Sequence, residues 1–129
     1  MPDSQALEVR IARKARNPWD GGLSGPIAGV IKKGDTVIMS YWAKAVKGEG
    51  VVSNAGLQLS GEPYTAMVLK PAQLTSEWQH FYVTTKAERD YAPSEAGYVI
   101  QVAGAKQTLR FGPIFIMNLG PNVDLASLP

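Results

Sequence analysis

Flat aromatic side chains recur beside polar ones along this sequence. Sugar rings present C–H faces that stack on aromatic rings, and hydroxyls that pair with amides and carboxylates. Residues of both types stand close together at several points of the chain. The candidate ligand-binding residues are Trp19, Asp20, Gln58, Tyr64, Tyr98 and Gln101. Together they could bind a neutral sugar by stacking and hydrogen bonding.

The three tryptophans differ in their sequence surroundings. Trp19 lies in Asn-Pro-Trp-Asp-Gly-Gly-Leu-Ser, where a proline and two glycines suit an exposed, rigid rim. Trp42 and Trp78 lie in segments typical of buried strands, so we predict that both belong to the core. The alternative for every one of these rings, Trp19 included, is that it only fills the core.

Catalysis has little support in the residues. The chain has one histidine, His80, and no cysteine, and it contains neither an HExxH nor a GxSxG motif. A glycosidase needs two cooperating acids in one cleft, whereas most of the acidic residues here fall in or beside turns. We therefore predict that the domain is not an enzyme.

Composition and charge limit the partners. A chain of 129 residues is the size of one domain, and no apolar run is long enough to span a membrane. The net charge of +2, with both signs scattered along the sequence, argues against nucleic acid and membrane partners. The start, Met1-Pro2-Asp3-Ser4, has no apolar signal region, so the chain is either cytoplasmic or lacks a removed signal; we favour the second, a secreted protein.

Alternation with a period of two dominates the chain, and helical spacing is nearly absent. The predicted strands are Leu7 to Ile11, Thr36 to Ala45, Ser53 to Ser60, Tyr64 to Lys70, Trp78 to Thr85, Gly97 to Ala103 and Leu109 to Leu119. About eight short strands separated by glycine and proline turns predict an all-β fold, a two-sheet antiparallel β-sandwich of the jelly-roll type. We expect this domain to cover residues 1–120, with 121–129 as a tail or the start of a linker.

The order of several segments resembles the carbohydrate-binding modules of families 4, 9 and 22. The segments are NPWDGGLS, VIKKGDTVIMSYWAKA, AGLQLSGEPY, LTSEWQHFYVTTKA and AGYVIQVAGAKQTLRFGPIFIMNLG, within roughly residues 6–120. The resemblance implies a jelly-roll module that binds single β-linked glycan chains in a groove and is attached to a plant-cell-wall glycoside hydrolase.

The resemblance also implies roles for particular residues. A tryptophan at the place of Trp19 and an aromatic residue at the place of Tyr64 clasp a sugar ring, with Gln58, Tyr98 and Gln101 beneath. The family's Ile-Asp-Asp, which helps hold a structural calcium ion, is replaced here by Gly112-Pro113-Ile114-Phe115. Calcium binding would then need other oxygens, such as backbone carbonyls, and the metal ligands stay unknown.

Among ligands, the sequence favours β-1,4-glucan, cello-oligosaccharides and related β-glucans such as xyloglucan. The expected groove has rings but few carboxylates or arginines. Two alternatives stay open. One is a xylan-binding module. The other is a structural sandwich domain, in which Trp19 and Tyr64 would form an interface with a catalytic neighbour.

Overall fold

The computed structural model describes residues 6–124, which fold into two four-stranded antiparallel sheets. The strands are β1 (Leu7–Ile11), β2 (Gly22–Pro26), β3 (Thr36–Gly48), β4 (Val51–Leu59), β5 (Ala66–Gln73), β6 (Gln79–Lys86), β7 (Ala96–Gln101) and β8 (Gln107–Asn118). One 3-10 turn, Pro18–Asp20, precedes β2. The predicted jelly-roll sandwich is confirmed. Among the described residues no helix is long and apolar enough to cross a membrane.

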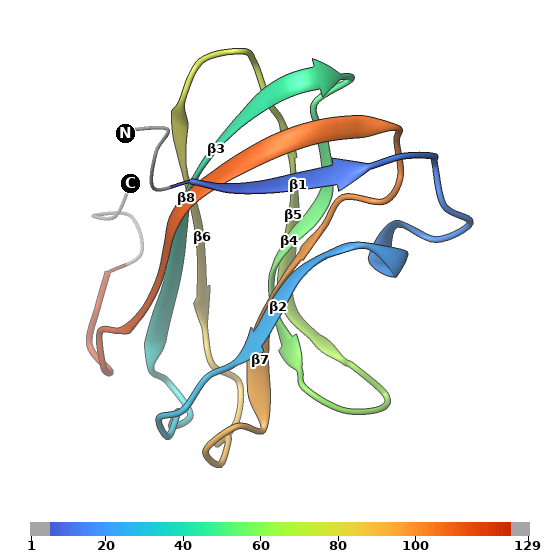
Figure 1. The fold of residues 1–129 in the computed structure, drawn as a ribbon. Helices are drawn as coiled ribbons and strands as arrows, with labels where there is room; N and C mark the ends of the chain where they lie inside the picture. Colours follow the sequence, from blue (N-terminus) through green and yellow to red (C-terminus); the bar gives the residue numbers. More distant parts are fainter. Residues whose placement is uncertain (1–5, 125–129) are drawn as a thin grey trace.

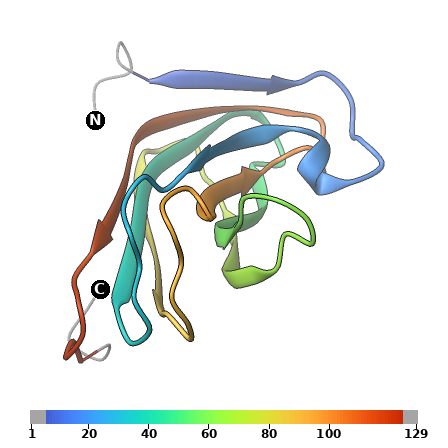
Figure 2. The ribbon, with the colours of Figure 1, turned by 90° about the horizontal axis from the view of Figure 1, so that it is seen from below.

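The two sheets pack face to face. Sheet A has the strand order β1-β8-β3-β6 and sheet B the order β2-β7-β4-β5 (Figure 1). Seen from below, sheet A curves around sheet B, which leaves the outer face of sheet B on the inside of that curve (Figure 2). The short strand β2 is missing from the strands predicted by alternation, because Gly22-Leu23-Ser24-Gly25-Pro26 has little β-propensity.

The core lies between the sheets and is apolar. Met39, Tyr41 and Phe111 of sheet A meet Leu57 and Ile100 of sheet B, and all five are fully buried. The ring of Tyr41 stacks on Phe81 with centroids 5.2 Å apart. In β6, Phe81 and Val83 face the core while His80, Tyr82 and Thr84 face away from it.

The prediction that Trp42 and Trp78 belong to the core is wrong. Trp42 follows the buried Tyr41 in β3, so its ring lies on the outer face of sheet A, stacked on His80 at 4.5 Å. Trp78 precedes β6 and is partly exposed, with Lys44 Nζ 5.2 Å from its ring. The misreading has a physical cause: all residues from Thr36 to Tyr41 are buried, so this central strand lacks the alternation that would separate its two faces.

Asp35 ties the start of β3 to the end of β8. Its Oδ2 accepts hydrogen bonds from Asn118 Nδ2 at 2.8 Å and from the Lys32 backbone N–H at 2.9 Å. These bonds, that of Asn118 first, hold the pKa of Asp35 below its ordinary value of 3.8. A lowered folded-state pKa stabilises the fold above the unfolded-state pKa, and that contribution is lost as the pH falls through the folded-state value.

We therefore expect acid destabilisation to depend on Asn118. Between about pH 5 and about pH 2, the melting temperature of Asn118→Ala should fall less steeply than that of the parent, because Asp35 loses its main stabilising partner. Thermal melts across this range measure both slopes. Parallel curves for the two proteins would show that the Asp35 bond to Asn118 contributes nothing to the pH dependence.

Candidate functional site

The candidate site is the outer face of sheet B. Side chains along β7 point alternately toward the core and toward this outer face. Ala96 and Ile100 point inward and are buried in the core, so Gly97, Val99 and Gln101 point outward. Cross-strand pairing extends this face in three rows. The rows are Gly22, Gln101 and Asn54; Ser24, Val99, Gly56 and Leu69; and Pro26, Gly97 and Gln58.

The middle of this outer face is recessed. Val99 and Gln101 are each only 8% exposed, although no other layer of the described chain packs over them. The neighbouring Gly56 and Gly97 add no side chains to the floor. The outer face of sheet B is therefore a shallow trough, a shape that suits an extended ligand.

Trp19 stands at one side of the trough. The 3-10 turn that carries it is closed by Asp20 N–H donating to Asn17 C=O at 3.1 Å and Asn17 N–H donating to Asp20 Oδ2 at 3.2 Å. Trp19 is 64% exposed, so the predicted exposure is confirmed. The carboxylate of Asp20, predicted to bind ligand, holds the turn that displays this ring.

Tyr64 follows the Gln58 end of β4. It lies in the turn after β4, where its N–H donates to Gly61 C=O at 2.8 Å, and its side chain is 51% exposed. In both ribbon views this turn and the 3-10 turn of Trp19 project on the same side of the molecule (Figures 1 and 2). The row of Asn54 lies next to the 3-10 turn, and the row of Gln58 lies next to the turn of Tyr64. Asn54 and Gln58 are four residues apart in β4, so the two rows are separated by about 13 Å.

Side-chain amides line the floor between the two rings. Asn54 Nδ2 donates a hydrogen bond to Gln101 Oε1 at 3.3 Å. This bond orients the Gln101 amide and leaves its Nε2 as a donor. Among residues 6–124 no group accepts from Gln101 Nε2, so that donor is available to a ligand. Asn54 was missed in the sequence because only strand pairing shows that it lies opposite Gln101.

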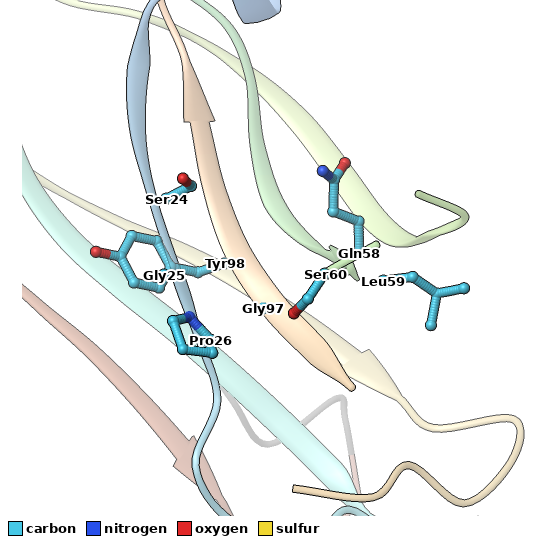
Figure 3. A pocket seen from close by; sticks show the side chains of 8 residues that line it. All are labelled: Ser24, Gly25, Pro26, Gln58, Leu59, Ser60, Gly97 and Tyr98. Carbon is cyan, nitrogen blue, oxygen red and sulfur yellow. The ribbon is translucent and has the colours of Figure 1, made fainter. Parts of the chain in front are cut away.

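Tyr98 faces away from Gln101 but lines a neighbouring hollow with Ser24, Pro26 and Gln58 (Figure 3). It is three residues from Gln101, so the two side chains point to opposite faces of β7. Tyr98 pairs with the buried Leu57, packs against the core and crosses beneath β2 at Gly25 (Figure 3). A Cβ at Gly25 would approach the ring to 2.8 Å, which explains a glycine in that edge strand.

Two adjoining hollows mark the trough. The first, of about 250 Å³, lies beside Trp19 and is lined by Asp20, Ser24, Val99 and Gln101 among others. The second, of about 190 Å³, lies between Pro26, Gln58 and Ser60 over Gly97 (Figure 3). Ser24 lines both. Apart from Asp20 the residues around them are uncharged, which suits a neutral ligand rich in hydroxyls.

The described residues offer no metal centre built from side chains. Among residues 6–124, no three His, Asp or Glu side chains gather closely enough to hold a metal ion. Asp35, which is buried, already accepts two hydrogen bonds within the protein. Calcium binding through backbone carbonyl oxygens stays a prediction.

Several solved structures with a similar fold are described as carbohydrate-binding modules or cellulose-binding domains. One described as "CBM4 structure and function" aligns over 88% of this chain and 82% of its own length, with 21% identity and a TM-score of 0.69. The N-terminal cellulose-binding domain of β-1,4-glucanase C from Cellulomonas fimi covers 93% of this chain and 79% of its own, with 22% identity and a TM-score of 0.61. The apo PbXyn10C CBM covers 93% and 71%, with 13% identity and a TM-score of 0.64.

Comparison of the sequences adds no relative. The sequence matches no protein-family model, and a comparison with curated proteins finds no significant match. The chain therefore shares its jelly-roll fold with solved carbohydrate-binding modules of families that include 4.

Proposed function

We propose that this domain is a non-catalytic carbohydrate-binding module that binds a single β-linked glycan chain along the outer face of sheet B. The carrying observation is the recessed trough, lined by uncharged residues apart from Asp20, with the exposed Trp19 beside it and the exposed Tyr64 in the turn that follows β4. The rings supply stacking, and the Gln101 and Gln58 amides supply hydrogen bonds from the floor. The sugar-binding domains of similar fold support this proposal.

The preferred ligand is a neutral β-1,4-glucan, taken as cello-oligosaccharide or as a decorated chain such as xyloglucan. The hollows contain no arginine or lysine that would select an acidic substituent. Glycine is required on the floor at Gly56 and Gly97, because a Cβ there would collide with the backbone of Val68 and of Gly25. Xylan, which is also neutral along its main chain, is the alternative ligand. In this proposal the module is secreted and directs an attached glycoside hydrolase to its substrate.

Affinity electrophoresis tests the proposal. The purified domain is run through gels containing soluble β-glucan, xylan, xyloglucan or mannan, with a polysaccharide-free gel as reference. Retardation by β-glucan or xyloglucan supports the preferred ligand, and retardation by xylan alone selects the alternative. Unchanged mobility in all four gels would contradict a glycan-binding function.

The Gln101 amide should contribute measurably to binding. Replacing Gln101 by leucine removes the donor at the middle of the floor, so we expect about a three- to tenfold loss of affinity for cello-oligosaccharide. Isothermal titration calorimetry measures the change. Gln79→Leu, at an exposed position in the edge strand of sheet A, is the matched control and should bind like the parent.

A second candidate function is packing against a neighbouring domain. Phe115 and Met117 project from the outer face of sheet A and are 57% and 51% exposed. Exposed apolar side chains grouped on one face favour a protein interface. This candidate differs from the notion that Trp19 and Tyr64 form such an interface, because it uses the other sheet. It gains weight if none of the four polysaccharides is bound.

A further inference from the structure

The structure gathers positive charge that is scattered in the sequence. On the outer face of sheet A, strand pairing places Arg10 of β1 beside Thr108 of β8, and Thr108 beside Lys47 of β3. Lys106, in the turn before β8, reaches the same place. The three strands lie side by side across the top of Figure 1. Arg10, Lys47 and Lys106 are exposed and surround one hollow of about 610 Å³.

The cations of this basic hollow are not neutralised by the described chain. Its one carboxylate, Glu8, is engaged by Arg110, whose Nε lies 3.1 Å from Glu8 Oε1. Among residues 6–124, no carboxylate pairs with Arg10, Lys47 or Lys106. Three unpaired cations around a concave surface concentrate positive potential there and attract an anion.

The lining of the basic hollow indicates the kind of anion. Ile11 and the exposed Val46 supply apolar contact, and the Thr108 hydroxyl supplies a neutral hydrogen-bonding group. Glu8 would repel a densely charged phosphate backbone but can accept hydrogen bonds from hydroxyls. The lining has no aromatic ring on which a nucleic-acid base could stack. Spaced carboxylates on a sugar chain fit this mixture better than nucleic acid.

We infer that the basic hollow on the outer face of sheet A is a second glycan site, which binds the carboxylates of a uronate-bearing polysaccharide. The choice of a polysaccharide over other polyanions rests on the proposed function. The trough lies on the outer face of sheet B, so the two ligands would occupy opposite sides of the sandwich. One domain could then hold a neutral glycan and an acidic matrix polysaccharide at the same time.

Calorimetric titration with de-esterified oligogalacturonate at low ionic strength tests this inference, with the methyl-esterified oligomer as the uncharged control. The parent should bind only the charged oligomer, and more weakly as salt is added. The triple variant Arg10→Gln, Lys47→Gln, Lys106→Gln should lose about tenfold in affinity. The control Lys32→Gln, Lys33→Gln, Lys86→Gln removes the same charge at the far ends of β3 and β6 and should bind like the parent.

Several results would decide against the site. Absence of binding to oligogalacturonate, equal binding by the esterified oligomer, or equal losses in both triple variants would overturn it. Binding of a single-stranded oligonucleotide but not of oligogalacturonate would assign the basic hollow to nucleic acid instead. Trp19→Ala should leave oligogalacturonate binding intact, because Trp19 lies on the other sheet. A parent that binds oligogalacturonate but no neutral glucan would refute the proposed function and leave this inference standing.

Discussion

Replacing Trp19 by alanine should abolish most binding of cello-oligosaccharide while leaving the fold intact. An aromatic anchor in a binding site commonly loses about 2 kcal/mol or more on truncation, which corresponds to roughly thirtyfold in affinity. The ring is 64% exposed, so its removal leaves no internal cavity. Tyr64→Ala should behave in the same way. Calorimetric titration beside a thermal melt measures both properties.

Two variants separate stacking from other causes of lost binding. Trp19→Phe keeps a flat ring and should recover part of the affinity. Trp42→Ala removes the same side chain from the outer face of the other sheet and should bind cello-oligosaccharide like the parent. It should melt somewhat earlier, because its stacking on His80 is lost. Unchanged affinity in Trp19→Ala together with a large loss of stability would make Trp19 a core residue.

Phe111→Ala should have the largest effect on stability. Phe111 is 1% exposed and packs with the Tyr41 ring at a centroid distance of 6.3 Å. Truncating a buried phenylalanine costs about 3–5 kcal/mol, a large part of the roughly 5–15 kcal/mol that stabilises a typical domain. We expect this variant to unfold at much lower denaturant concentration or to fail to fold, which chemical denaturation measures.

Phe115→Ala is the matched control, since it truncates the same residue type in the same strand. Phe115 is 57% exposed on the outer face of sheet A, so its truncation should change stability by no more than about 0.5 kcal/mol. Equal destabilisation by the two variants would contradict the assignment of Phe111 to the core and Phe115 to the surface.

The fold class could be predicted from the sequence because most strands alternate. Period two in Leu7 to Ile11 and in Gln79 to Lys86 separates a core face from an outer face without any knowledge of partners. Alternation fails where a strand is covered on both sides, as in the first half of β3, and there the faces of Tyr41 and Trp42 could not be told apart.

A bulge in β8 also makes the facing of its residues hard to predict from alternation. Phe111 and Phe115 are four residues apart, so regular alternation would put them on one face. The register between β3 and β8 shifts at Gly112-Pro113, which adds one residue and reverses the facing of the second half of the strand. A glycine and a proline inside a predicted strand were the available signal for this reversal.

The candidate site was partly predictable. The flanking proline and glycines indicated that Trp19 is exposed, whereas Tyr64, expected to begin a strand, lies in the turn before β5. Which residues share a face depends on strand pairing and register, neither of which the sequence states. For that reason the opposite facing of Tyr98 and Gln101 was not foreseen, Asn54 was missed, and the cations of the basic hollow looked scattered.

The central claim, that the outer face of sheet B binds a neutral β-glucan chain, is tested most directly by nuclear magnetic resonance. Backbone amide shifts are followed while cello-oligosaccharide is added to the labelled domain. The account predicts shift changes for Trp19, Ser24, Tyr64, Gly97 and Gln101, with sheet A largely unaffected. Changes confined to the outer face of sheet A, around Trp42, His80 and Tyr82, would contradict it.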